Sequence, residues 1–250
     1  MRVALRRGRL EHQRASALIT SANDSLVGNL QPDYWRFEGG INVDGALRAR
    51  AGPDLVDACL ALPIKDDVEK RDLVRWTRAV KVGESSVVRC PTGSAVRTTA
   101  GLLEADAIIH AVAPDVELTY GRYRSSDGPE DLLRSAYRAA FEAAGDVECV
   151  ACPALGAGVK GWDPAVTAAF GLEAAARAVL DGAAPRRVDF VLDDAAFASW
   201  SRVFETLLGP GDEWTIDPSK LVADDVGDLL PLCDVDEICL PRTLWANPEN

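Results

Sequence analysis

The chain is poor in the residues that several protein classes need. Its 250 residues include one methionine, two histidines and six cysteines, and only 6% are aromatic. Six scattered cysteines are too few for a small secreted disulfide scaffold, so we expect reduced thiols and a cytoplasmic protein. No stretch approaches the roughly 18 consecutive apolar residues that span a bilayer, and the basic N-terminus lacks a signal-peptide core. We therefore expect no membrane partner.

Positive charge is also scarce. The 27 lysines and arginines stand against 39 aspartates and glutamates, which gives a formal net charge of −12 and a pI near 4.7. This balance excludes a basic nucleic-acid coat protein, because an acidic surface repels bulk nucleic acid. Any ligand that carries phosphate must be held by local geometry. The remaining composition, 48% apolar and 26% charged, is that of a soluble globular protein.

Short apolar runs alternate with amphipathic stretches along most of the chain. The expected strands lie at 17–20, 107–112, 149–152 and 188–192, and the expected helices at 43–60, 132–144, 164–180 and 195–208. Asp163 followed by Pro164 is typical of a helix start. This alternation favours an α/β fold with a mainly parallel central sheet. Because ligands of such sheets bind at the carboxyl ends of the strands, the turns after the strands are the candidate sites.

The sequence changes character after Pro210. Residues 211–250 are rich in acids and prolines and have only short apolar clusters, which predicts an extension packed on the domain or on a partner. We expect one α/β domain over residues 1–210, with insertions near 29–38 and 62–88.

The two insertions leave alternatives open. The first brings three aromatic residues and Arg36 to a place where they either form a lid or anchor an extended loop. The second places Arg71, Arg75 and Arg78 at helical spacing, which fits a solvated face or a contact with a nucleic-acid or protein substrate.

The first candidate turn, residues 20–23, directly follows an expected strand. The Asn23 carboxamide offers two donors and an acceptor at the edge where ligands bind. Ser21 and Ala22 would contact the ligand beside it. Alternatively, Asn23 only caps the turn.

The second candidate turn, residues 39–45, leads into an expected helix. Paired glycines let backbone amides approach a ligand closely, and a helix N-terminus favours a phosphate. The Asp44 carboxylate either interacts only with the helix dipole or orients a water beside the ligand. The expected ligand contacts of this turn are Gly39, Gly40, Ile41, Asn42, Val43 and Gly45.

The third candidate turn, residues 153–162, has three glycines between a strand and a helix. Such a turn is typical of a phosphate cradle made of backbone amides. Trp162 would cover a sugar or a ring, unless it belongs to the core. The expected ligand contacts here are Pro153, Leu155, Gly156, Ala157, Gly158, Val159, Lys160, Gly161 and Trp162.

Other motifs predict no cofactor and no metal site. Residues 156–161 match the dinucleotide pattern G-x-G-x-x-G, but the next helix begins after the last glycine, so we discount the match. Cys149 and Cys152 have metal or redox spacing. In a strand, however, residues three apart face opposite sides, which favours two buried thiols. His110 lies within a strand and is expected to be a core residue.

Five segments, taken in order, resemble the macrodomain family, which binds ADP-ribose. Thr20-Ser21-Ala22-Asn23 is similar to its N-A-A-N turn, and Gly39-Gly40-Ile41-Asn42-Val43-Asp44-Gly45-Ala46-Leu47 to its G-G-G-V-D-G-A-I stretch. Cys90-Pro91-Thr92-Gly93-Ser94-Ala95 resembles C-P-T-G-E-A, Ile109-His110-Ala111-Val112-Ala113-Pro114 resembles I-H-T-V-G-P, and residues 153–162 resemble P-A-I-S-T-G-V-Y-G-Y. The similarity covers roughly residues 3–208.

The resemblance implies a three-layer α/β/α sandwich with a mixed, mainly parallel sheet. It implies a diphosphate between turns 39–45 and 156–161, with the distal ribose near Asn23 and Trp162. In hydrolytic members of the MacroD type, the residues that match Asn23 and Asp44 serve the reaction. The implied activity is hydrolysis of an ADP-ribose derivative, either an ADP-ribosylated protein or nucleic acid or O-acetyl-ADP-ribose. A non-catalytic ADP-ribose reader is the alternative.

Three positions depart from the family pattern. Arg9 replaces the aspartate that binds adenine, and arginine cannot accept the hydrogen bond of the adenine amino group. Either Glu11 takes over, or the base is held differently, or the ligand carries an extra anion that Arg9 binds. Arg48 replaces the histidine one turn after the catalytic aspartate, which favours a reader. An aromatic residue that would stack on adenine is absent from residues 192–194.

Overall fold

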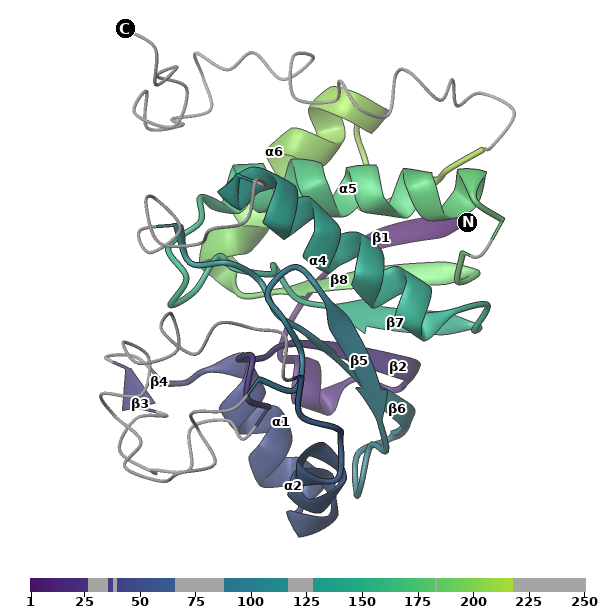
Figure 1. Ribbon diagram of the computed structural model, residues 1–250. Helices are drawn as coiled ribbons and strands as arrows, with labels where there is room; N and C mark the ends of the chain where they lie inside the picture. The colour runs from purple at the N-terminus through teal and green to yellow at the C-terminus, as the bar shows by residue number, and fades with distance from the viewer. Residues whose placement is uncertain (27–35, 38–39, 66–87, 117–127, 183, 218–250) are drawn as a thin grey trace, which may run out of the picture.

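Seven strands form one mixed sheet between two layers of helices (Figure 1). The computed structural model describes residues 1–26, 36–37, 40–65, 88–116, 128–182 and 184–217. Arg71, Arg75, Arg78, most of both expected insertions and residues 218–250 lie outside the described residues. The three-layer α/β/α fold is the one that the sequence predicted.

The strands of the sheet run in the order β5-β6-β2-β7-β8-β1-β9. The five central strands are mutually parallel, and β5 and β9 pair antiparallel at the two edges. A separate hairpin is formed by β3 and β4. The bounds are β1 Arg2–Arg7, β2 Ala15–Ser21, β3 Arg36–Phe37, β4 Gly40–Ile41, β5 Ala95–Thr98, β6 Ala105–Ala111, β7 Cys149–Cys152, β8 Arg187–Leu192 and β9 Glu213–Thr215.

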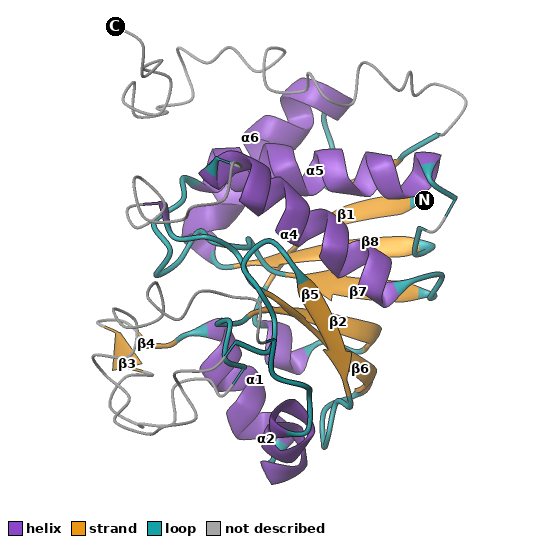
Figure 2. Cartoon of the chain, in the orientation of Figure 1, coloured by secondary structure: helices purple, strands orange, loops and turns teal. Residues whose placement is uncertain are grey.

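Alternate residues of the central strands enter two separate cores. Ile19 and Ile109 point into the core under three long helices, whereas Leu18 and Ile108 point into the smaller core on the other face. Figure 2 shows these helix layers on either side of the strands. The first layer consists of α4 Pro129–Ala144, α5 Pro164–Leu180 and α6 Asp194–Leu208, and the second of α1 Val43–Ala51 and α2 Pro53–Leu60, with the 3-10 turn η1 Leu10–His12 against α1.

One helix prediction is wrong in a way that the backbone explains. Residues 43–60 form two helices, because α1 ends at Gly52 with a φ of +82° and Pro53 begins α2. Glycine adopts this left-handed conformation without a steric penalty, and proline is suited to the first helical position. The turn at Gly52 lets α2 pack against the smaller core through Leu55 and Cys59.

Two edge features were not predicted. The basic N-terminal segment forms β1, whose residues Val3 and Leu5 are buried in the larger core. The expected extension begins with β9, which pairs with β1, and Ile216 is buried beside it. Within the described residues, no helix is long and apolar enough to cross a membrane. The four described cysteines, Cys59, Cys90, Cys149 and Cys152, are free thiols.

Candidate functional site

A cavity of about 400 Å³ lies at the carboxyl ends of three central strands. Its walls come from the turns after β1, β7 and β8 and from the first residues of α1, α5 and α6, since parallel strands end at one edge of the sheet. Five of the predicted ligand residues line it, namely Arg9, Val43, Pro153, Ala157 and Gly158. Asp193 and the first residues of α6 also line it, and sequence reasoning missed them although Asp193 has the pattern of a helix cap.

Three helices begin at this cavity, each capped by a polar side chain. The Asn42 Oδ1 atom accepts from the Gly45 N–H at 2.8 Å, and the Asp163 Oδ1 atom accepts from the Ala165 N–H at 2.7 Å. Asp193 caps α6 in the same way. Helix N-termini that converge on one cavity stabilise an anionic ligand. Asn42, which we predicted as a ligand contact, has the role of a helix cap.

The glycine-rich turn 153–162 is closed by its own backbone hydrogen bonds. The Trp162 N–H donates to the Gly156 carbonyl at 3.1 Å, and the Gly161 N–H donates to the Gly158 carbonyl at 3.0 Å. Gly156 and Gly161 have φ values of +82° and +77°, which only glycine adopts easily. Val159 is 53% exposed at the outer side of the turn.

Two predicted ligand residues of this turn lie in the larger core. Trp162 is only 2% exposed and belongs to the larger core, with its Nε1–H donating to the Pro114 carbonyl at 2.9 Å. Leu155 is fully buried, and its N–H donates to the Tyr137 hydroxyl. Trp162 therefore takes the core position that the sequence left open as the alternative, since its large apolar surface is more stable there.

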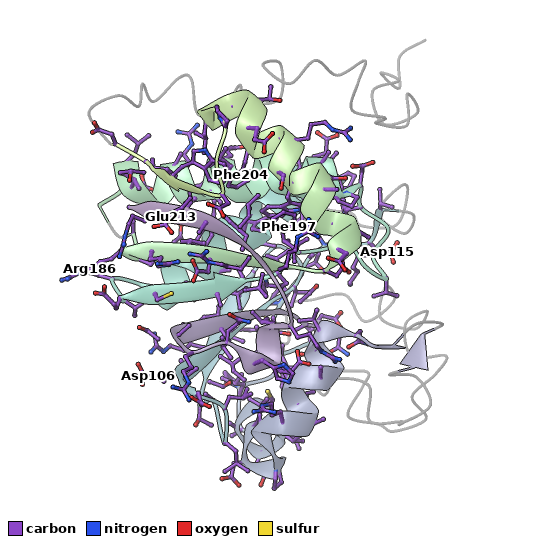
Figure 3. The ribbon with its side chains drawn as sticks, turned by 180° about the vertical axis from the view of Figure 1, so that it is seen from behind. Asp106, Asp115, Arg186, Phe197, Phe204 and Glu213 are labelled. Atoms are coloured by element: carbon purple, nitrogen blue, oxygen red, sulfur yellow. The ribbon has the colours of Figure 1, made fainter. Side chains whose placement is uncertain are left out.

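Charged residues link this turn to the turn after β2. Burial lowers the pKa of Lys160, and the carboxylates of Asp24 and Asp115 oppose that shift. Burial likewise raises the pKa of Asp24, against the opposing effect of Lys160. Figure 3 shows Asp115 at the end of the molecule where β3 and β4 lie, opposite the end that carries Arg186. Sequence reasoning named Lys160 as a ligand contact and missed its acidic neighbours.

Asn23 lies in a tight turn after β2. Its Oδ1 atom accepts a hydrogen bond from the Ser25 hydroxyl at 3.0 Å, and its backbone carbonyl accepts from the Leu26 N–H. The Ala22 N–H donates to the Ala111 carbonyl of β6 and so anchors the turn to the sheet. Asn23 and Ser21 are half-buried, whereas Ala22 is buried.

Asp44 lies beside the end of β2 and forms an ion pair. Its Oδ1 atom accepts from the Thr20 hydroxyl at 3.3 Å, and its Oδ2 atom accepts from the Arg48 Nε–H at 2.7 Å. The side chains of Arg48 and Asp44 are 4% and 13% exposed. Burial alone would lower the pKa of Arg48, but Asp44 and Cys59 together outweigh it, and the net shift is upward. Sequence reasoning identified Arg48 as a departure without finding this partner.

Neutral groups lie behind this ion pair. The His110 Nε2 atom is 2.8 Å from the Thr98 hydroxyl and 3.6 Å from Cys59 Sγ. Burial, helped by the charge of Arg48, lowers the pKa of His110 to about 4, so its ring is neutral at physiological pH. His110 is the core residue that we expected. Among the described residues, no group of three or more His, Cys, Asp or Glu side chains could hold a metal ion.

Arg9 and Glu11, the two residues that we considered for contact with the adenine base, both line the cavity. The Arg9 Nε–H donates to Glu11 Oε1 at 2.5 Å. The Arg9 side chain is 58% exposed, whereas that of Glu11 is 8% exposed. Glu11 therefore presents a buried carboxylate at the place where Arg9 replaces the expected aspartate.

The comparisons with known proteins agree with this architecture. The macro domain family model matches residues 19–170. A macro domain-containing protein of Streptomyces nogalater is 36% identical over 162 residues, which cover 64% of this chain and 69% of that protein. The O-acetyl-ADP-ribose deacetylase of Escherichia coli K12 is 32% identical over 216 residues, which cover 85% and 98%. The chain belongs to the macro domain family.

Solved structures show the same fold. The Oceanobacillus iheyensis macrodomain with ADP matches with a TM-score of 0.56 and 22% identity, over 80% of this chain and 88% of that one. The Trypanosoma brucei macrodomain in complex with ADP-ribose matches with a TM-score of 0.55 and 21% identity, over 79% and 67%.

Proposed function

We propose that the protein binds ADP-ribose, or a closely related nucleotide, in the cavity and hydrolyses an ADP-ribose derivative. The observation that carries this proposal is the position of Asp44. It is the next residue after Val43, which lines the cavity, and its carboxylate accepts a hydrogen bond from Thr20, three residues before Asn23. The name of the Escherichia coli relative, an O-acetyl-ADP-ribose deacetylase, supports the reaction class.

In the proposed complex the diphosphate lies between the start of α1 and the glycine turn. The helix N-termini would stabilise its charge, together with backbone amides of residues 40–44 and 156–160 other than Ala157, whose N–H is bonded within the turn as those of Gly45 and Gly161 are. The Asn23 carboxamide would bind the distal ribose, so that binding itself positions the scissile bond.

Asp44 would orient a water molecule toward that bond and accept its proton. For an O-acetyl ester, the water oxygen bonds to the ester carbonyl carbon, and the bond from that carbon to the ribose oxygen breaks. The ribose oxygen takes the proton that Asp44 accepted, and the products are ADP-ribose and acetic acid, which ionises to acetate. A positioned general base of this kind contributes about 10²–10⁴-fold to the rate.

Turnover assays test the proposal. The full chain would be incubated with O-acetyl-ADP-ribose and with mono-ADP-ribosylated protein and nucleic acid, and the release of ADP-ribose would be measured. Turnover of any one of them supports hydrolysis and identifies the linkage. We place the reaction in the cytoplasm because the described cysteines are free thiols.

A ligand screen by thermal unfolding gives an independent prediction. A ligand present at 100 times its Kd should raise the free energy of unfolding by about 2.7 kcal/mol. We expect this stabilisation for ADP-ribose and a smaller one for AMP at the same concentration, because AMP lacks the second phosphate and the distal ribose and should bind more weakly. Equal shifts for both nucleotides would contradict a site that extends to Asn23.

The second candidate function is a reader that binds ADP-ribose without chemistry. The ion pair between Asp44 and Arg48 favours it, because neutralising a buried guanidinium is a structural role that explains the Asp44 carboxylate without catalysis. Calorimetry separates the two functions: a reader binds ADP-ribose and leaves every modified substrate intact.

At the base end, we propose that Glu11 accepts the hydrogen bond of the base amino group and that Arg9 orients it. Glu11→Gln should therefore lower the preference for ADP-ribose over its inosine analogue by about 10-fold, since a hydrogen bond to a charged group contributes about 1.5–3 kcal/mol. The measurement is the ratio of the two Kd values by calorimetry. If Arg9 instead binds an extra anion, the wild type will bind a phosphorylated ADP-ribose more tightly than plain ADP-ribose. The Arg9→Asp variant will then prefer plain ADP-ribose.

A further inference from the structure

The guanidinium of Arg48 joins three separate parts of the chain. Its Nε–H donates to Asp44 Oδ2 at 2.7 Å, and its Nη2 donates to the Leu26 carbonyl at 3.0 Å. Its Nη1 lies 3.9 Å from Cys59 Sγ on α2. One side chain on α1 therefore contacts both the proposed general base and the end of the turn that carries Asn23.

The partner carbonyl belongs to a constrained residue. Leu26 is fully buried, and its φ of +59° places a residue with a Cβ in the left-handed region. This conformation costs about 1–2 kcal/mol, so surrounding contacts must hold it. The Leu26 N–H donates to the Asn23 carbonyl, and the Leu26 carbonyl accepts from Arg48. Arg48 thus restrains the residue that closes the Asn23 turn.

The chemistry of arginine suits this double contact. The planar guanidinium presents donors in fixed directions, whereas a lysine ammonium is a single point charge. Because Arg48 is only 6% exposed, water competes little for its hydrogen bonds. His110 behind it is neutral, so Arg48 faces Asp44 without a second positive charge from that ring.

We propose that Arg48 is a positioning residue for the reaction: it fixes the Asp44 carboxylate relative to the Asn23 turn. This inference rests on the proposed hydrolytic function. In the sequence, the replacement of the family histidine by Arg48 favoured a reader without activity. Under this proposal the arginine instead supports the hydrolytic reaction. Apolar residues of similar volume often replace buried ion pairs without loss of stability, so a role in geometry explains the pair better than stability does.

The test compares three variants of the full chain with the wild type. Arg48→Met removes the charge and the donors at similar length, and Arg48→Lys keeps the charge but loses the fixed fork. Arg50→Met is the matched control, because Arg50 is exposed on the same helix. Each protein is assayed for kcat and KM on the substrate that the wild type turns over, for the Kd of ADP-ribose, and for Tm.

We expect Arg48→Met to lower kcat by about 100-fold, the size of loss that a displacement of about 1 Å produces at a catalytic group. The Kd of ADP-ribose should stay nearly unchanged, since Arg48 does not line the cavity. Arg48→Lys should lose less kcat than Arg48→Met, and Arg50→Met should match the wild type. If Arg48→Met does not fold, Arg48→Lys carries the test, and full kcat in that variant overturns the proposal.

A double-mutant cycle with Asp44→Asn separates positioning from a structural role. If Arg48 acts through Asp44, removing Arg48 in the Asp44→Asn background causes no further loss of kcat in single-turnover assays. An equal loss in both backgrounds shows a structural role and overturns the inference while the proposed function stands. A wild type that binds ADP-ribose and turns over no substrate overturns the proposed function, and the inference with it.

Discussion

Asp44→Asn is expected to lower turnover of the substrate by about 10²–10⁴-fold, the contribution of a positioned general base. The amide keeps the size of the carboxylate. Its single oxygen can still accept from the Arg48 Nε–H while its NH2 group donates to the Thr20 hydroxyl oxygen, but it cannot take a proton from water. The measurement is kcat/KM on the substrate identified in the turnover assays. The Kd of ADP-ribose should change little, because the proposed role of Asp44 is to act on the water and not to hold the nucleotide.

Asp54→Asn is the matched control for this variant. Asp54 lies in the first turn of α2, as Asp44 lies in the first turn of α1, but it is exposed. We expect wild-type kinetics for it. Turnover of Asp44→Asn within tenfold of the wild type would contradict the proposed role of Asp44.

The stability of Asp44 variants follows from the ion pair. A first-turn acid that only interacts with the helix dipole contributes about 0.3–1 kcal/mol. Asp44 also pairs with Arg48, whose side chain is 4% exposed, so Asp44→Ala leaves a buried guanidinium without its carboxylate. That change costs about 3–5 kcal/mol. Asp44→Asn is therefore the better probe of catalysis.

Gly156→Ala is expected to destabilise the fold and to abolish ligand binding. A Cβ at this position would lie 2.7 Å from Cδ1 of Trp162, and the residue has a φ of +82°. The indole cannot move freely, because it is buried and its Nε1–H is bonded to the Pro114 carbonyl. Left-handed strain of about 1–2 kcal/mol and overpacking of about 1–3 kcal/mol add to a loss of about 2–5 kcal/mol, measured by denaturant unfolding.

Gly158→Ala separates the fold from the ligand site. Gly158 is exposed, no atom lies within 4 Å of its added Cβ, and it lines the cavity. We expect wild-type stability and weaker binding of ADP-ribose by calorimetry, since the methyl group would enter the space proposed for the diphosphate. Equal stability of the two alanine variants would contradict the packing of Gly156 on Trp162.

Local sequence signals were sufficient to predict a helix whose ends are set by its own residues. Asp163 and Pro164 predicted the first residues of α5, and the helix ends at Leu180 as expected. The same periodicity failed at residues 43–60, since apolar spacing continues across Gly52 while the backbone turns there. The strands β1 and β9 were missed because their place in the sheet depends on pairing with distant segments, β1 with β8 and β9 with β1.

The candidate site was predictable in part for the same reason. The motifs named Asn23, Asp44 and the glycine turn, because these signals lie within single turns. Motif order could not show that Trp162 supports the turn from the core, or that Asn42 caps α1. Those outcomes depend on which atoms meet after folding.

The fold class, the family and the residues proposed to perform chemistry followed from the amino-acid sequence alone, since they depend on hydrophobic spacing and residue type. Tertiary structure decided which of those residues share a cavity and which charges meet. Arg48 shows the difference: its partners lie 4, 11 and 22 residues away. Only the packing of α1 and α2 on the sheet brings them within reach of one guanidinium.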